Sequence, residues 1–500
     1  MTDPTPSVDD RSGPDQTTPA KKTRQTQPAA ATELVDLAQE LYEFGTATTG
    51  EAFGVPLDGP RVTFLLRGGR QSLRAELAKR YFAEHARAAS SQALADAMLT
   101  LEGIGQEWET ELHQRVASDG LDRSVWIDIG DLTGRAIHIT PQHWNIHDRA
   151  PVLFRRSALT APLPEPVRHP DGLELLWESL NVTPDDRPLV AAWLVAALVP
   201  GIAHPILAFF GEQGTGKSTA TKLVVSIVDP SPVPARKPPK DEESWVSAAA
   251  GSWVIGLDNL SRVTDWFSDS LCRAVTGDGD VRRRLYTDAE LHVYAFRRAI
   301  ALNGIDIGTL RGDLAERLLP INLDRIPDHQ RREETEFNNT WTRQHPHVLA
   351  AVLDLTTAVF QRLPAIELDT KPRMADFARI IAAVDQELGT TGLDHYTAKQ
   401  GSMAADSIDT DPFIAALARA IRFDWTGTAA ELLATLDPSP EPTPKGWPSH
   451  PRTVTGLLKR WAPVLRKTGW QIDDARDRKD ITRWTITAPD PPPEQRGLDF

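Results

Sequence analysis

The pattern of apolar positions divides the 500 residues of the chain into segments of different character. Residues 1–31 are rich in Pro, Thr, Asp and Lys and carry almost no large apolar side chain, so we expect a disordered tail. Residues 32–170 combine helical periodicity with short alternating runs, which predicts an α+β domain. Residues 171–325 alternate apolar-periodic helices with short apolar strands, which is typical of an α/β core.

The second half of the chain is predicted to be mainly helical. Residues 326–400 carry helical patterns over 333–363 and 373–388 with no strand between them, and the polar residues 401–411 are expected to form a linker. Residues 412–487 predict three helices followed by two strands, the winged-helix arrangement, and 488–500 a second disordered tail. The elements expected in this last domain are helices over 412–421, 429–436 and 451–467 and strands over 469–473 and 481–486.

The N-terminal domain is predicted to mix helices and short strands. The helices are expected over 33–44, 73–89 and 93–103, and the strands over 110–116, 124–128 and 136–140. Asp128 and Asp131 fall at the turn between the last two strands, where paired carboxylates suggest a metal site. An acidic exposed hairpin is the preferred interpretation, because no further cluster of ligands accompanies them.

The most specific motif of the chain follows an apolar run at residues 205–210. The sequence Gly211-Glu212-Gln213-Gly214-Thr215-Gly216-Lys217-Ser218, followed by Thr219, fits the phosphate-binding pattern GxxxxGK[ST]. Glycine lets backbone N–H groups face a phosphate, and the N-terminal end of the predicted helix 219–228 attracts the same anion. Lys217 is expected to reach the β- and γ-phosphates of ATP, and the Ser218 hydroxyl to hold Mg²⁺.

A second apolar run ends in the acid that such a site needs. Asp258 follows residues 252–257 and is assigned, with Ser218, to the Mg²⁺ shell. Asn259 comes next, and its amide can position the attacking water but cannot accept a proton, so the general base stays open. The run Asp241-Glu242-Glu243 is an alternative source of that base, although an acidic helix start is the preferred interpretation there.

Polar residues farther along complete the predicted hydrolysis site. The strand 298–302 ends in Asn303, which is expected to lie between the strands of Lys217 and Asp258 and to touch the γ-phosphate or the water. Arg317 and Arg311 are candidates for the arginine that completes the site of a neighbouring subunit and stabilises the charge of phosphoryl transfer. Ion pairs with nearby acids are the alternative for both.

Two basic clusters suggest contacts with DNA. Arg282, Arg283 and Arg284 follow a Gly-rich turn and suit phosphate contacts, although a solvated charge run or a contact with a neighbouring subunit explains them equally well. Residues 445–486 hold ten Lys and Arg but only four Asp, in a chain of formal net charge −14. On the third predicted helix and the wing, the residues expected to contact DNA are Arg452, Lys459, Arg460, Arg476, Arg478 and Lys479.

Composition narrows the class of protein. The net negative charge argues against general nucleic-acid affinity outside these clusters. A single cysteine, Cys272, excludes an internal disulfide and fits a reducing, cytoplasmic location. The most apolar stretch, 189–207, is short and is interrupted by Pro200 and Pro205, so we expect no membrane span.

Taken in order, the motifs resemble those of the phage- and plasmid-type primase-helicase ATPases, which are related to superfamily 3 helicases and the AAA+ class. The chain looks closest to the stand-alone ATP-binding proteins of actinobacterial mobile elements. The resemblance covers roughly residues 61–486. The motifs that carry it are Gly211–Ser218, Trp253–Asn259, Thr276–Asp288, Leu302–Ile305 and Arg311–Arg317.

The resemblance implies an AAA+-like P-loop core with a helical lid. It also implies that this core assembles as a homo-hexamer. Arg282–Arg284 would face a central channel and grip single-stranded DNA, Arg373 on the lid would contact the γ-phosphate, and the winged helix would bind duplex DNA. Two departures matter. No primase pattern precedes the core, and Asn259 stands where many related ATPases have Glu.

Three functions follow from these motifs. The first is an ATP-hydrolysing DNA helicase or translocase of a mobile-element replication system. The second is a slow ATP-dependent DNA-binding switch without strand separation, which Asn259 and the missing primase favour. The third is an AAA+ remodeller that does not act on nucleic acid.

Overall fold

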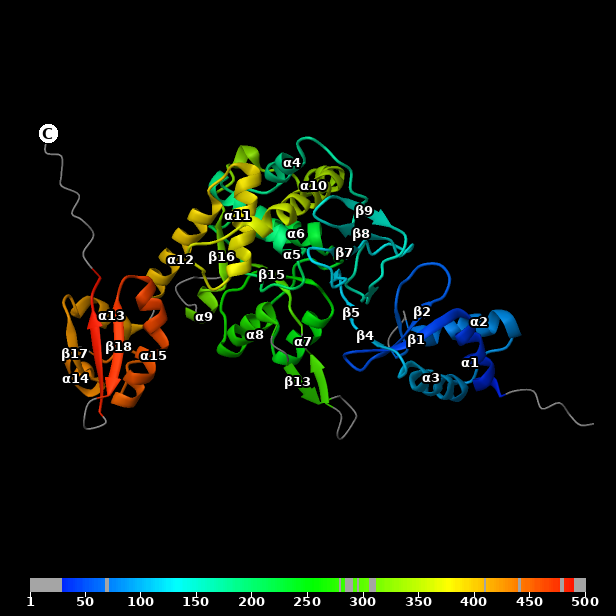
Figure 1. The fold of residues 1–500 in the computed structure, drawn as a ribbon, viewed down its shortest axis with the longest axis horizontal. Helices are drawn as coiled ribbons and strands as arrows, with labels where there is room; N and C mark the ends of the chain where they lie inside the picture. Colours follow the sequence, from blue (N-terminus) through cyan, green and yellow to red (C-terminus); the bar gives the residue numbers. More distant parts are fainter. Residues whose placement is uncertain are drawn as a thin grey trace, which may run out of the picture.

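The computed structural model describes residues 29–67, 72–277, 280–283, 291–294, 296–304, 312–408, 411–438, 442–476 and 481–489. The two predicted tails lie almost entirely outside these residues. Three bodies follow one another along the chain: an N-terminal body, a larger central body and a C-terminal body, which helix α12 joins to the central one (Figure 1).

The N-terminal body packs three helices on a four-stranded sheet of order β3-β2-β1-β4. Its first helix ends earlier than predicted, because Tyr42 and Phe44 are buried while Glu43 between them is exposed, a strand period that takes over after Leu41. Two further strands, β5 and β10, form a short parallel pair at its edge. The elements are α1 (Ala30–Leu41), β1 (Tyr42–Ala47), β2 (Ala52–Pro56), β3 (Phe64–Leu65), α2 (Leu73–His85), α3 (Ser91–Gly105), β4 (Glu109–Thr110), β5 (Leu112–His113) and β10 (Leu153–Phe154).

A second sheet of the predicted N-terminal domain belongs to the central body instead. Strands β6 to β9 form an antiparallel meander, and their buried side chains, such as Ile127 and Ile137, share one hydrophobic core with the helices and strands that follow. The predicted boundary at residue 170 therefore does not separate two cores. Arg115 reinforces the junction, since it is 1% exposed and its Nε donates to Asp229 Oδ1 at 2.9 Å. The strands are β6 (Val116–Ser118), β7 (Val125–Asp128), β8 (Ala136–Ile139) and β9 (Trp144–His147).

A four-stranded parallel sheet of order β12-β15-β11-β16 forms the centre of the molecule. Every residue of β11 is buried, as a central strand covered on both faces requires. Parallel strands bring their carboxyl ends to one edge, so the residues that follow β11, β12 and β15 meet there. The elements are β11 (Ile206–Phe210), β12 (Val254–Leu257), β15 (Ala299–Asn303) and β16 (Leu318–Asn322), with helices α5 (Arg187–Ala197), α6 (Lys217–Val228), α7 (Glu242–Ala250), α8 (Asp265–Thr276) and α9 (Gly312–Ala315).

Helices after the sheet pack back onto the central body, where the sequence predicts a helical region. The polar linker predicted at 401–411 is wrong for most of its length, because α12 continues to Ile408. Contacts with the sheet explain this: Gln400 Nε2 donates to Leu318 O at 2.8 Å, and Lys399 Nζ donates to Pro320 O at 2.9 Å. The helices are α10 (Glu334–Arg362), α11 (Ala375–Leu388) and α12 (Gly392–Ile408), and α4 (Gly172–Ser179), which precedes the sheet in the chain, packs against α10.

Among the described helices, one, Glu334–Ala365, is long and apolar enough to cross a membrane by length and composition alone. Over half of its apolar window, 56%, is buried inside the protein, as in the core helix of a soluble fold. Its buried residues, among them Leu349 and Phe360, belong to the central core.

The C-terminal body has a hydrophobic core of its own, built around Trp461 and Trp484. Its three helices lie where the sequence predicts them, and an additional strand, β17, extends the two predicted strands to an antiparallel sheet of order β17-β19-β18. The pattern hides β17 because it is four residues long and runs directly into the capping box of Thr428 and Glu431. The elements are α13 (Pro412–Ala420), β17 (Trp425–Thr428), α14 (Ala429–Thr435), α15 (Pro451–Lys467), β18 (Gln471–Arg476) and β19 (Thr482–Thr487).

Two buried histidines predict acid sensitivity of the central body. Burial lowers the pKa of His204 and of His345 from 6.5 to about 4, so both rings are neutral in the fold and take up a proton on unfolding. Because the unfolded state binds more protons, stability is fully present above about pH 6.5 and is lost as the pH falls toward 4, by roughly 3 kcal/mol for each histidine. Urea unfolding at about pH 7 and about pH 5 should show most of this loss, about 2 kcal/mol for each histidine. His345→Gln should flatten the pH dependence, whereas the exposed His143→Gln should leave it unchanged.

Candidate functional site

The loop Gly211–Ser218 connects β11 to α6 and has the backbone of an anion cradle. Gly211, Gly214 and Gly216 all adopt positive φ, and a Cβ on Gly211 would lie 2.6 Å from the Leu323 carbonyl oxygen. The conformation disfavours a side chain at all three positions, and space also excludes one at Gly211. Lys217 Nζ donates to the carbonyl oxygens of Gly211 and Glu212, each at 2.6 Å, so its ammonium group is held across the loop.

Three side chains from three neighbouring elements meet beside this loop. Ser218 Oγ donates to Asp258 Oδ1 at 2.7 Å, and Asn303 Nδ2 donates to the same oxygen at 2.9 Å. Ser218 lies in the first turn of α6, Asp258 follows β12 and Asn303 ends β15. Since β15 lies between β11 and β12, Asn303 occupies the position between the loop and the acid.

Asn303 uses every polar atom of its side chain although it is 3% exposed. Its Nδ2 also donates to Thr221 Oγ1 at 2.9 Å, and its Oδ1 accepts from the Asn259 backbone N–H at 3.0 Å. Thr221 lies about one helical turn after Ser218, and the motif gave no signal for it. The amide of Asn303 therefore fixes the loop helix, the acid and the following residue relative to one another.

The backbone explains why an asparagine follows Asp258. The backbone φ angle of Asn259 is 58°, which lies in the left-handed region. Asparagine tolerates this region better than glutamate does. Gly304 packs against it, because a Cβ on Gly304 would lie 3.0 Å from the Asn259 Cα. A glutamate at this position would have to accept a strained backbone.

These residues line one cavity of about 650 Å³. Of the lining residues that the structure describes, Asp258 is the one acid, so no second carboxylate among them can serve as the general base. Asp241 instead caps helix α7, where its Oδ1 accepts from Ser244 N at 2.8 Å, so the acidic run is a helix start as preferred. The lining residues are Phe209, Phe210, Gly211, Gln213, Gly214, Thr215, Gly216, Lys217, Ser218, Thr219, Asp258, Asn259, Asn303 and Gly304.

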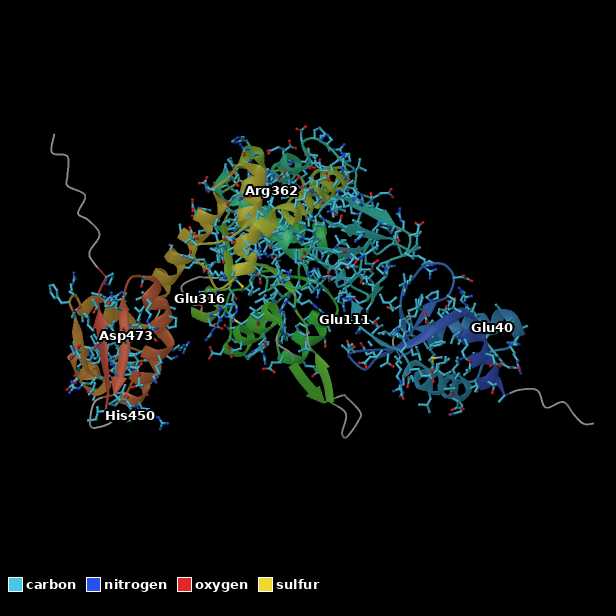
Figure 2. All side chains as sticks on the ribbon, in the orientation of Figure 1. Glu40, Glu111, Glu316, Arg362, His450 and Asp473 are labelled. Carbon is cyan, nitrogen blue, oxygen red and sulfur yellow. The ribbon has the colours of Figure 1, made fainter. Side chains whose placement is uncertain are left out.

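Two of the arginines proposed for this site, Arg317 and Arg373, make ion pairs at α9. Arg317 is 8% exposed, and its Nη1 donates to Asp313 Oδ1 at 2.5 Å. Arg373 Nη2 lies 2.9 Å from the same carboxylate, and its Nη1 donates to Glu316 Oε2 at 2.6 Å. Figure 2 shows Glu316 on the side of the central body nearest the C-terminal body. The alternative of local ion pairs thus describes Arg317, and Arg311 lies outside the described residues.

Cys272 lies beside this ion-pair cluster and is buried. Burial raises the pKa of its thiol to about 12, so the thiol stays protonated at neutral pH. Cys272 is a core residue.

Two family models match parts of the chain. Residues 174–406 match the family model of the actinomycete integrative conjugative element replication protein, and residues 413–495 match that of the AICE RepA C-terminal domain. These matches support a replication protein of mobile elements. No curated protein matches the chain.

The sequence identity between this chain and the solved structures that align with it is low. The apo structure of the NrS-1 C terminal region (305-718) aligns over 92% of this chain and 100% of its own, with 9% identity and a TM-score of 0.39. The A form apo structure of the same region aligns over 91% of this chain and 99% of its own, with 10% identity and a TM-score of 0.38.

The first basic cluster of this replication protein lies on a β-hairpin of the central body. Strands β13 (Asp280–Arg283) and β14 (Leu291–Tyr294) pair antiparallel and project away from the parallel sheet (Figure 1). Arg282 and Arg283 belong to β13, and Arg284 lies outside the described residues. Arg297 fixes the base of the hairpin, since its Nη2 donates to Thr276 O at 2.9 Å and its Nη1 to Gly201 O at 2.6 Å.

The second basic cluster lies on the C-terminal body. Arg452, Lys459 and Arg460 are exposed on α15, at spacings that place them on one side of the helix, and Lys459 lies 4.0 Å from Asp474. Arg476 ends β18. Arg478 and Lys479 lie outside the described residues. The opposite side of α15 is buried, through Val454, Leu458 and Trp461 among others.

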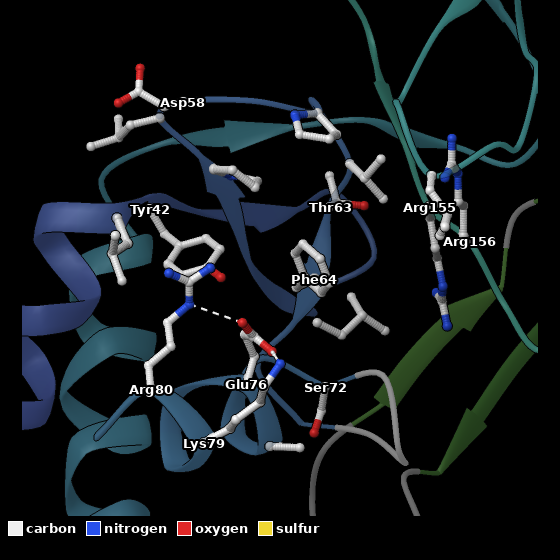
Figure 3. A pocket seen from close by; sticks show the side chains of 18 of the residues that line it. Tyr42, Asp58, Thr63, Phe64, Ser72, Glu76, Lys79, Arg80, Arg155 and Arg156 are labelled. Atoms are coloured by element: carbon white, nitrogen blue, oxygen red, sulfur yellow. Dashed lines mark hydrogen bonds and ion pairs between the residues drawn. The ribbon is translucent and has the colours of Figure 1, made fainter. Parts of the chain in front are cut away.

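A larger hollow, of about 1150 Å³, lies between the N-terminal body and the residues after β10 (Figure 3). Tyr42 and Phe64 line it together with Arg80, Arg155 and Arg156. All three arginines are paired with acids: Arg80 Nε donates to Glu76 at 2.9 Å, Arg155 to Glu51, and Arg156 to both oxygens of Asp128 at 2.7 and 2.8 Å. Their positive charge is therefore already compensated, which makes the hollow a poor site for a nucleoside triphosphate.

The same contacts resolve the two acids Asp128 and Asp131. Asp128 is 2% exposed and bound to Arg156, so the prediction that it is exposed is wrong, although the predicted hairpin is present as β7 and β8. Asp131 Oδ2 accepts from Arg135 Nε at 2.9 Å. Within the described part of the chain, no group of three or more His, Cys, Asp or Glu could hold a metal ion.

Proposed function

We propose that this protein is an ATP-hydrolysing DNA helicase or translocase that acts in the replication of a mobile genetic element. The observation that carries the proposal is the convergence of Lys217, Ser218, Asp258 and Asn303 on one cavity at the carboxyl edge of the parallel sheet. This is the arrangement that phosphoryl transfer from a nucleoside triphosphate requires.

The donor set of this cavity fits Mg²⁺. Ser218 Oγ and Asp258 Oδ1 lie 2.7 Å apart, and both are hard oxygen ligands next to the lysine. The ion, when bound, would neutralise charge on the β- and γ-phosphate oxygens. Lys217 would bind the same oxygens, and the backbone N–H groups of Gly214–Lys217 would hold the β-phosphate.

Asn303 and Asn259 would orient the attacking water. The Asn303 amide is fixed by its hydrogen bonds with Thr221, Asp258 and the Asn259 backbone, and it lies beside the acid. The Asn259 side chain adds a second amide that cannot accept a proton. We therefore expect a modest basal rate of hydrolysis that DNA raises.

The basic clusters supply the proposed DNA contacts. The hairpin that carries Arg282 and Arg283 would grip single-stranded DNA, and α15 would bind duplex DNA as the third helix of a winged helix. We further propose a homo-oligomer, expected to be a hexamer, in which Arg311 or Arg317 completes the neighbouring site. For Arg317 this requires that it leave Asp313.

A second function is favoured by one specific observation. Among the described residues that line the cavity, Asp258 is the one acid, and it is assigned to the metal rather than to proton abstraction. A slow ATP-dependent switch that assembles on DNA without separating its strands fits such a site. Unwinding of a forked duplex distinguishes the two functions, because the switch should leave the fork intact.

The test of the proposal is ATP hydrolysis by the full chain with and without circular single-stranded DNA. We expect Mg²⁺-dependent release of phosphate that single-stranded DNA stimulates several-fold or more. A rate that does not respond to DNA would instead support a remodeller of other substrates.

Replacing Asn303 with alanine should lower turnover by roughly 10²-fold, because it removes the hydrogen bonds that position Asp258, Thr221 and the Asn259 backbone around the reacting phosphate. Nucleotide affinity should change by no more than a few-fold, since Lys217 and the loop remain. Steady-state kcat and KM, measured with a thermal unfolding control, separate the two effects. The exposed Asn339→Ala provides the matched substitution and should behave as wild type.

A further inference from the structure

The segment after β16 runs along the phosphate-binding loop, on the flank of β11 opposite Asp258 and Asn303. The sheet order places β16 on one side of β11 and β15 with β12 on the other. Leu323 N donates to Phe210 O at 2.8 Å, which starts the segment at the beginning of the loop. Farther along, a Cβ on Gly216 would lie 3.5 Å from Ile326 Cδ1. The segment thus lies beside the loop from Gly211 to Gly216.

Asn181 fastens this segment to the loop. Its Nδ2 donates to the carbonyl oxygen of Thr215 at 3.3 Å and to that of Asp324 at 2.5 Å. Asn181 lies well before the loop motif in the chain, so sequence spacing gave no reason to include it. The two hydrogen bonds of Asn181 hold Asp324 next to Thr215. They therefore set the path of the residues after Asp324 along the loop.

The segment delivers an arginine to the rim of the cavity. A Cβ on Gly214, which lines the cavity, would lie 3.0 Å from Arg331 Nη2. The Arg331 side chain is 51% exposed, and its ion pair with Asp328, at 3.2 Å, involves a carboxylate that is itself 78% exposed. Such an exposed pair is weak and exchanges readily for a better anion. Arg317 and Arg373, by contrast, are engaged at α9.

We propose that Arg331 is a nucleotide-binding residue that contacts the phosphate chain of ATP from the flank opposite the metal side. This inference rests on the proposed function. A planar guanidinium at the glycine loop can donate two charge-assisted hydrogen bonds to phosphate oxygens. Arg331 would exchange its ion pair with Asp328 for these two hydrogen bonds. The triphosphate is then held between Arg331 on one flank and Lys217, Ser218 and Asp258 on the other.

The test is the affinity of the full chain for a fluorescent, ribose-labelled ATP in the presence of Mg²⁺. Arg331→Ala should weaken binding about tenfold or more, as loss of a charge-assisted hydrogen bond to phosphate implies. Arg331→Lys should recover part of that loss, since it restores the charge without the fork. The matched control is Arg332→Ala, which removes a neighbouring exposed arginine and should stay within about twofold of wild type.

Inorganic tripolyphosphate identifies which part of the nucleotide Arg331 contacts. Tripolyphosphate has no base or ribose, so its ability to displace the fluorescent nucleotide should fall in Arg331→Ala by the same factor as the affinity for ATP. Equal inhibition constants for tripolyphosphate on wild type and Arg331→Ala would overturn the phosphate assignment. A variant that binds ATP as tightly as Arg332→Ala would overturn the role of Arg331 altogether.

The two proposals fail in different ways. If the wild-type chain binds no nucleotide, the proposed function itself is wrong. If the wild type binds nucleotide and Arg331→Ala binds it equally well, the proposed function stands and the assignment of Arg331 falls.

Discussion

Replacing Lys217 with alanine is expected to reduce ATP hydrolysis by at least about 10²-fold, because it removes the one lysine that lines the cavity. In the fold, Lys217 Nζ spans the loop between the carbonyl oxygens of Gly211 and Glu212, each at 2.6 Å. Nucleotide binding should weaken as well, since the same ammonium group contacts the β- and γ-phosphates in the proposed complex. Phosphate release and nucleotide titration measure the two effects separately.

Helix α6 itself provides the control for this substitution. Lys222 lies on the same helix, is exposed and does not line the cavity, so Lys222→Ala should retain full hydrolysis. Lys217 is not part of a hydrophobic core, and its replacement should leave the thermal unfolding temperature within a few degrees of wild type. Hydrolysis by Lys217→Ala at the wild-type rate would show that the Gly211–Ser218 loop is not the catalytic site.

The residues of the cavity could be located from the sequence because each follows a buried strand directly. An apolar run before Gly211, another before Asp258 and a third before Asn303 are local signals, and the rule that parallel strands share one carboxyl edge brings the three together. Only one assumption about strand order was required: that the strand of Asn303 lies between the strand before Gly211 and the strand before Asp258. Local pattern and topology were sufficient here.

Residues that reach the cavity from outside these strands could not be found in this way. Asn181 contacts the loop across a separation of 34 residues, Arg331 approaches it from farther still, and neither belongs to a recognisable motif. Their positions depend on how α4 and the segment after β16 pack, which the apolar pattern alone does not specify. The domain boundary at residue 170 failed for the same reason, since the meander β6–β9 and the central helices share one core.

Charge pairing is a further property that sequence could not assign. Arg317, Arg373 and Arg156 are each basic residues near a predicted site, and all three are bound to acids of their own chain. Whether an arginine is free for an anion depends on how exposed its ion pair is, and the pair of Arg331 with Asp328 is more exposed than the pairs of Arg373 with Asp313 and Glu316 on and beside α9. Arg331 is a better candidate than Arg373 on this ground.

The second large effect is expected for duplex DNA. Replacing Arg452, Lys459 and Arg460 of α15 together with alanine should weaken binding to a duplex about 100-fold at low salt, because three exposed cations on one face of a helix are removed. If each contacts one phosphate, the slope of log affinity against log salt concentration should become shallower by about 2.7. Affinity measured between about 50 and about 200 mM salt, a range suited to such contacts, gives both quantities.

A matched triple variant on the same body separates this contact from the effect of net charge. Arg419, Arg422 and Lys445 are also exposed, and none belongs to α15, so their replacement with alanine removes the same charge from other surfaces. We expect that variant to keep most of its affinity and the wild-type salt slope. If both triple variants lose affinity equally, α15 has no special role and the C-terminal body attracts DNA only through its overall charge. Because the hydrophobic core of this body is separate from that of the central body, neither variant should alter ATP hydrolysis without DNA.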